Sequence, residues 1–141
     1  MMFKSKLAIF FGTLIFASSV LAGQDKPDVC PDMPAIQSEG MTNAAEILEG
    51  FYLTFHVSHY ETPSNWVFIM GGITAESEER AIETSNQILS TMSGSPTPEN
   101  DGQGSWVCQY ATNTPELSAF AVQADDMLSP VKMSRYLRKN H

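Results

Sequence analysis

The stretch FYLTFHVS, residues 51–58, decides how the rest of the sequence is interpreted. Its apolar and polar side chains alternate, with Phe51, Leu53, Phe55 and Val57 on one side and Tyr52, Thr54, His56 and Ser58 on the other. Successive side chains of a β-strand point to opposite faces, so a period of two with aromatic and β-branched residues predicts a half-buried strand.

A second strand is predicted over the run WVFIMGGI, residues 66–73, after a turn at PSN, residues 63–65. This run is apolar on both faces, which indicates a central strand or one that is covered on both sides. The two strands predict an antiparallel hairpin that ends at Gly71 and Gly72.

The clearest helical segment is TAESEERAIETSNQILSTMSG, residues 74–94. Thr74 is predicted to cap its start, acidic residues fill the first turn, and Gly94 ends it. Apolar residues recur at intervals of three and four, which gives a stripe that can pack on a sheet.

The other segments are assigned by composition and pattern. They are an extended lead-in (residues 23–34), a short helix that starts at Thr42 or Asn43 and ends at Gly50, a polar loop (93–104), a third strand (105–112) and a basic tail (129–141) with the pattern of a short amphipathic helix. Residues 116–124 alternate like a strand but contain helix-favouring alanines, and we prefer a fourth strand paired with the third.

The sequence therefore predicts an α+β domain. It has a small antiparallel sheet of about four strands, with one long helix packed on a face. The order is helix, strand, strand, helix, strand, strand, tail.

Residues 1–22 have the pattern of a signal peptide. Two lysines precede an uncharged apolar run from Leu7 to Phe16, and small residues lead to a predicted cleavage after Ala22. An uncleaved membrane anchor is the alternative, but the run is shorter than the ~20 residues that span a bilayer. We expect residues 23–141 to form a single exported domain without stable membrane insertion, in the periplasm, at the cell surface or outside the cell.

The charge balance argues against binding to nucleic acid. The chain carries 16 acidic and 8 basic residues, with a formal net charge of −8. Half of the basic residues lie in the tail, which leaves the body strongly acidic. Such a surface repels phosphate backbones.

Cys30 and Cys108 are the two cysteines of the chain. In an exported protein an even number of cysteines favours a disulfide. A two-thiolate metal or redox site is the alternative, but it is disfavoured because the two residues are far apart in sequence and no histidine lies near either.

His56 and His59 are the candidate metal ligands in the middle of the chain. On a strand they point to opposite faces, so they are not expected to bind one ion together. His56 alone can ligate an iron. Tyr52 and Tyr60 are predicted on the same face, each four positions and about 13 Å along the strand from His56, which is too far for either to bind the same metal directly. Alternatively, this face is an exposed polar row, and His59 packs against the core at the strand end.

No motif for catalysis is present. The chain lacks HExxH, GxSxG and paired-cysteine patterns, and the acids after MGGIT would repel a phosphate. We therefore expect the protein not to be an enzyme.

Several segments together resemble a known group: the signal-like N-terminus, Cys30-Pro31, FYLTFHVSHYE, NWVFIMGGITAESEERAIETSNQIL and WVCQY. Over the whole chain the sequence is similar to the small secreted hemin-binding protein of the legionellae and its relatives. The resemblance implies an exported hemin-binding protein with a role in iron acquisition, but it carries over no ligand residues.

The residues themselves supply candidates for hemin binding. The axial donors would be His56, Tyr52 and Tyr60, and the lack of CxxCH makes any haem non-covalent. Aromatic residues that could wall a slot are Phe51, Phe55, Trp66, Phe68 and Trp106, and the cations for the propionates would be Lys132 and Arg135. The alternative is a secreted protein-interaction domain, effector-like or inhibitor-like, with no cofactor.

Overall fold

The computed structural model describes residues 27, 29–102, 104–124 and 128–138. The predicted signal peptide and the third histidine, His141, lie outside this part of the chain. In the part that is described, no helix is both long enough and apolar enough to cross a membrane.

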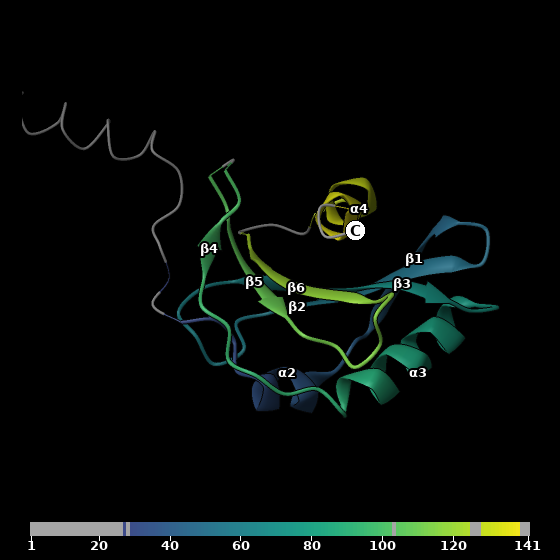
Figure 1. The fold of residues 1–141 in the computed structure, drawn as a ribbon, viewed down its shortest axis with the longest axis horizontal. Coiled ribbons are helices and arrows are strands. Elements are labelled where there is room, and N and C mark those ends of the chain that lie inside the picture. The colour runs from purple at the N-terminus through teal and green to yellow at the C-terminus, as the bar shows by residue number, and fades with distance from the viewer. Residues whose placement is uncertain (1–26, 28, 103, 125–127, 139–141) are drawn as a thin grey trace, which may run out of the picture.

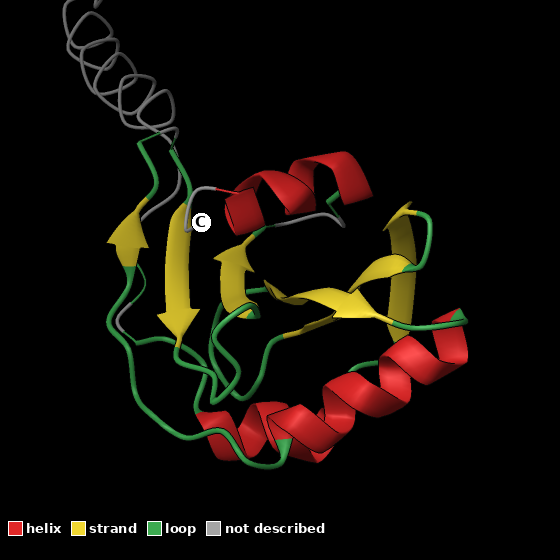
Figure 2. Cartoon of the chain, turned by 45° about the vertical axis from the view of Figure 1, so that its right-hand side comes forward, coloured by secondary structure: helices red, strands yellow, loops and turns green. Residues whose placement is uncertain are grey.

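The centre of the molecule is one six-stranded antiparallel sheet with the strand order β1-β2-β3-β6-β5-β4 (Figure 1). Its strands are β1 (Asn43–Leu48), β2 (Phe51–Ser58), β3 (Trp66–Thr74), β4 (Glu99–Asn100), β5 (Trp106–Tyr110) and β6 (Ser118–Gln123). The described helices are α2 (Met33–Glu39), α3 (Glu78–Leu89) and α4 (Pro130–Arg138). Helices α2 and α3 cover one face of the sheet, and α4 lies on the other (Figures 1 and 2).

The central hairpin is confirmed, but it continues to Thr74 and does not end at Gly71 and Gly72 as predicted. β2 and β3 pair antiparallel with Phe55 opposite Ile69 and His56 opposite Phe68. β3 is a central strand, paired on its other side with β6, as its apolar character on both faces predicts. The preferred strand within residues 116–124 is also confirmed, because β6 pairs with β5.

Other parts of the predicted order are wrong. The helix expected between Thr42 and Gly50 is strand β1, which pairs with β2 at the sheet edge. The lead-in contains the start of helix α2, with a proline in its first turn, and the polar loop contains the short strand β4. The sheet thus has six strands in place of about four. In the described part of the chain, two shorter helices, α2 and α4, pack on the sheet in addition to the long helix α3.

The boundaries of the long helix also differ from the prediction. Thr74 is the last residue of β3, and the helix is capped by Ser77, whose hydroxyl accepts from the Arg80 amide at 3.2 Å. The helix ends at Leu89, before Gly94.

Each face of the sheet carries its own hydrophobic core. The core under α2 and α3 contains Tyr52, Trp66, Phe68, Met70, Cys108 and Tyr110. The core under α4 contains Leu53, Val67, Ile69, Phe120, Val122 and Met133.

The face of β2 that looked polar is therefore largely buried. Tyr52 is 5% exposed and Thr54 is fully buried, so the predicted exposed polar row is wrong for these two residues. Thr54 is accommodated because its hydroxyl lies 2.6 Å from that of Ser85 on α3, which satisfies both buried groups.

Candidate functional site

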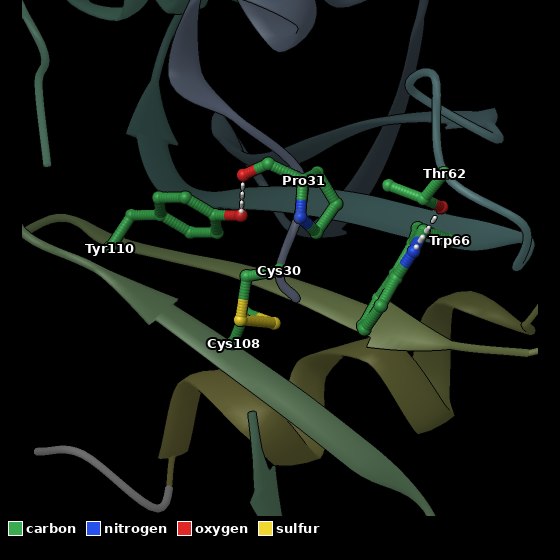
Figure 3. Close-up of a disulfide and its surroundings, with 6 residues drawn as sticks. All are labelled: Cys30, Pro31, Thr62, Trp66, Cys108 and Tyr110. Atoms are coloured by element: carbon green, nitrogen blue, oxygen red, sulfur yellow. Dashed lines mark hydrogen bonds between the residues drawn. A yellow bond between two sulfur atoms is a disulfide. The ribbon is translucent and has the colours of Figure 1, made fainter. Parts of the chain in front are cut away.

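The predicted disulfide is present between Cys30 and Cys108 (Figure 3). It joins the segment before α2 to β5, with a Cα–Cα distance of 5.9 Å, and both cysteines are buried. Next to it, the Tyr110 hydroxyl donates to the Pro31 carbonyl at 2.6 Å. The bridge therefore fixes α2 to the sheet, and the two-thiolate metal site is excluded as long as this bond is present.

His56 lies near the end of β2, where the C-terminal end of α2 reaches the sheet. Its Nε2 is 2.9 Å from Glu39 Oε1, and its Nδ1 is 2.8 Å from Thr42 Oγ1. The second carboxylate oxygen of Glu39 accepts from the Ser58 hydroxyl at 2.7 Å. We call Glu39, Thr42, His56 and Ser58 the Glu39 cluster.

Local backbone geometry explains how Glu39 arrives there. Helix α2 ends at Glu39 because Gly40 adopts φ 73°, a left-handed conformation that favours glycine. The chain then turns back through Thr42 into β1, which runs beside β2. Glu39 and Thr42 thus approach the same imidazole from two sides.

The cluster is partly open to solvent. The His56 side chain is 20% exposed and that of Glu39 is 39% exposed. The hydrogen bond from Ser58 lowers the pKa of Glu39 below its ordinary value, and His56 contributes in the same direction, although partial burial opposes them. Glu39 is therefore an ionised acceptor near neutral pH.

Replacing Glu39 by glutamine tests this electrostatic assignment. A carboxylate whose pKa is depressed in the folded state stabilises the fold above its unfolded pKa, near 4.5, and that contribution is lost as the pH falls through the lower folded value. Because the carboxylate is well exposed, we expect a loss of less than about 1 kcal/mol at pH 5.

Urea denaturation of wild type and Glu39→Gln at pH 5 and pH 3 measures the effect. The difference in unfolding free energy should shrink at the lower pH. Glu116→Gln, which removes an exposed acid in the loop before β6, serves as the matched control. A difference for Glu39→Gln that stays constant down to pH 3 would contradict the assignment.

The two candidate tyrosines are placed differently from His56. Tyr60 follows the end of β2, is 2% exposed, and donates its hydroxyl to the His56 carbonyl at 3.3 Å. Burial raises the pKa of Tyr60 well above its usual value. Burial, together with the carboxylates of Glu46 and Glu78, also raises the pKa of Tyr52. Both phenols are therefore held in the neutral form, which is the weaker form for iron ligation.

His59 lies in the turn after β2. It is exposed, so the expectation that it packs against the core is wrong. Its Nδ1 lies 3.0 Å from the Ser64 carbonyl oxygen, within the loop that leads to β3. In the same loop Thr62 accepts from the Trp66 indole N–H at 3.0 Å (Figure 3). Among the described residues, no group of three or more His, Cys, Asp or Glu side chains is placed to hold a metal ion.

The five aromatic residues considered for a hemin slot do not form one cluster at His56, although Phe68 is its cross-strand partner on β3. Trp66 and Phe68 are fully buried under α2 and α3. Phe55 packs on the opposite face of the sheet, and Trp106 lies on β5, beyond β3 and β6.

The two cations considered for the propionates are also remote. Lys132 and Arg135 are exposed on α4, which lies on the other side of the sheet from the Glu39 cluster. They are therefore not placed to contact a group bound at His56.

Sequence reasoning missed a shallow pocket at the β4–β5 side of the sheet. It has a volume of about 390 Å³ and is lined by Pro96, Thr97, Glu99, Gln109, Tyr110 and Ala111. Its signal in the sequence is the pair of prolines that keeps the chain from pairing with β5 before Glu99. This lining offers no imidazole for an axial bond.

Fold and site together define a small disulfide-bonded α+β domain with a partly exposed histidine held by a carboxylate. Residues 29–136 match a family described as "Domain of unknown function (DUF4949)", and the chain belongs to this family. No curated protein and no solved structure matches the chain. The disulfide is consistent with an oxidising, exported location.

Proposed function

We propose that this protein is an exported, non-enzymatic hemin-binding protein in which His56 supplies one axial nitrogen. The observation that carries the proposal is the imidazole of His56, which is oriented by two side chains and is 20% exposed. The resemblance of the sequence to a secreted hemin-binding protein directs the proposal to hemin rather than to a free metal ion.

The donor set around His56 fits a single axial bond. A ligating imidazole usually donates its other N–H to a carboxylate or carbonyl, which fixes its tautomer. Glu39 is in that position at Nε2, so Nδ1, which now faces the Thr42 hydroxyl, is the nitrogen that can turn to iron. The tautomer follows from these partners, because the ionised carboxylate requires a proton on Nε2.

The surroundings of His56 do not form an enclosing apolar slot. The candidate wall residues are divided between two faces of the sheet. The proposal is therefore limited to attachment at the rim of the sheet through one histidine. Such a site would suit uptake or transfer of hemin better than chemistry on it, because deep burial is what isolates reactive haem from solvent.

Export is part of the proposal. Two features support it: the basic and then apolar pattern of residues 1–22, and a disulfide, which persists in oxidising compartments.

A titration with hemin tests the role of His56. We expect wild-type protein to give a saturable Soret shift, and His56→Ala to bind at least about tenfold more weakly because the axial nitrogen is lost. His59→Ala, which removes an exposed histidine three positions away, is the matched control and should bind like wild type.

A second variant separates ligation from structural support. His56→Gln keeps a side chain that can hydrogen-bond to Glu39 but has no imidazole, and it should lose the shift while unfolding near the wild-type midpoint. An unsaturable absorbance rise in wild type, or an unchanged shift in both His56 variants, would refute the proposal.

A further inference from the structure

The two edges of the sheet are built differently. At one edge, β4 has only two residues, and Pro96 and Pro98 just before it lack the N–H needed to extend the pairing. Short strands and prolines are devices that blunt an edge against further pairing. At the other edge, β1 has six residues, NAAEIL, and no proline.

The outer side of β1 is open in the described part of the chain. β1 is terminal in the strand order and pairs with β2 alone. The helices that contact β1, α3 and α4, lie on its two faces and leave the edge itself uncovered (Figures 1 and 2). An edge strand of this kind presents the N–H and C=O groups of alternate residues to any extended chain beside it.

Two exposed apolar side chains lie at this end of the sheet, Leu48 on the edge strand β1 and Phe51 on its neighbour β2. Leu48 is 69% exposed and Phe51 is 37% exposed, and they are opposite each other in the β1–β2 pairing. The Phe51 ring occupies the space that a Cβ at Gly72 would need, so it is held against the sheet backbone. The ring thus lies toward β3, and Leu48, on β1 itself, is the apolar anchor for a chain that runs along this edge.

The charges near β1 determine whether a second copy of this chain or a basic segment of another protein is the better partner for this edge. Glu46 and Glu49 are exposed on the β1–β2 hairpin. The Ala75 amide donates to the Gly50 carbonyl at 3.0 Å, which brings the acidic start of α3, with Glu76 and Glu78, beside the same hairpin. Arg80 of α3 is also exposed, but its guanidinium is paired with Glu83 at 3.1 Å. Lys132 and Arg135 are exposed on α4, which packs on the opposite face of the sheet from α3. A second copy of this chain would bring like charges together, whereas a basic segment would be attracted.

We propose that β1 is a docking edge for an extended, lysine- or arginine-rich segment of a partner protein, which adds as a further strand and packs on Leu48. Main-chain pairing would supply affinity, and the acidic hairpin would select the charge of the partner. This interaction does not require hemin and does not use His56.

Two synthetic peptides of about eight residues test the proposal, a length that matches a typical strand. One alternates lysine with valine and the other alternates glutamate with valine, and both are blocked at their ends. Binding to the full protein is measured by fluorescence anisotropy, and the site is mapped by amide hydrogen exchange. We expect the lysine peptide to bind saturably and the glutamate peptide not to bind. The bound lysine peptide should slow amide exchange in residues 43–48 and leave exchange in residues 99–110 unchanged.

Charge variants give the matched comparison. Glu49→Lys should weaken binding of the lysine peptide roughly three- to tenfold and allow the glutamate peptide to bind. Glu116→Lys makes the same charge change in the loop before β6 and should have little effect. Leu48→Ser, which is exposed and does not threaten the core, should weaken the lysine peptide as well.

Four results would overturn the proposal. They are equal binding of the two peptides, equal effects of Glu49→Lys and Glu116→Lys, protection along β4 and β5, and concentration-dependent protection of β1 without any peptide. The last of these would identify a second copy of the chain as the occupant.

Discussion

Replacing Cys30 and Cys108 together by alanine is expected to lower the free energy of unfolding by about 4 to 5 kcal/mol. The bridge spans a sequence separation of 78, and the chain-entropy model assigns a loop of this length a stabilisation of that size. Both sulfurs also lie in the core under α2 and α3, so their loss removes packing. The measurement is urea denaturation of the double variant and of the oxidised wild type.

The reduced wild-type protein is the natural control, because it loses the bond and keeps both side chains. Its unfolding midpoint should lie close to that of the double variant. Helix α2 keeps further attachments, since Gln37 donates to the Leu89 and Met92 carbonyls at 2.9 and 3.0 Å, so we expect near-native secondary structure in the variant at 25 °C. If the double variant and the reduced protein both unfold at the same urea concentration as the oxidised wild type, the disulfide contributes little to stability.

Replacing Phe68 by alanine is the second change with a large expected effect, a loss of about 3 to 5 kcal/mol. Phe68 is fully buried on the central strand β3. Its ring packs edge-on against that of Tyr110, with centroids 5.5 Å apart. Truncation leaves a cavity in the core under α2 and α3, and the neighbouring strands of the sheet are too rigid to close it.

Two variants calibrate the effect of Phe68→Ala. Phe68→Leu retains most of the volume and should cost less than about 1.5 kcal/mol. Phe51→Ala removes the same side chain from a position that is 37% exposed and should also cost much less than Phe68→Ala. If Phe68→Ala and Phe51→Ala lower stability equally, the core assigned to this face is wrong.

Strands β2 and β3 could be predicted because the order of their apolar and polar residues indicates directly which side chains are buried. β2 alternates, and β3 is apolar on both sides, so their pairing and the central place of β3 follow from residues 51–73. β1 was mistaken for a helix because alanine, glutamate and leucine favour helices locally. Pairing with β2 overrides that preference, and it places Ala45 opposite Leu53 over the second core.

Helix α2 shows the opposite error. Prolines at positions 31 and 34 suggest an extended chain, but a proline is tolerated in the first turn of a helix because its missing N–H has no intrahelical partner there. The helix then gains its stability from Met33 and Ile36, which are buried against the sheet. This burial depends on chain segments far away in sequence.

The alternation along β2 assigned His56 to the same face as Tyr52 and Thr54, but it did not reveal how this face is covered. Ser85 partners Thr54 across 31 positions, and Glu39 and Thr42 reach His56 from 17 and 14 positions away. Spacings of this size carry no periodic signal. The Glu39 cluster therefore could not be assembled from sequence.

By itself, the sequence determined the central hairpin, the pairing of the two strands within residues 105–124 with each other, and the partnership of Cys30 with Cys108. These features depend on alternation and cysteine number, which are local or countable properties. Only the tertiary structure decided that residues 43–48 form an edge strand, that the polar-looking face of β2 lies under two helices, and that Glu39 meets His56. The physical reason is that burial and hydrogen-bond partners of those residues come from elements that approach only when the whole chain has folded.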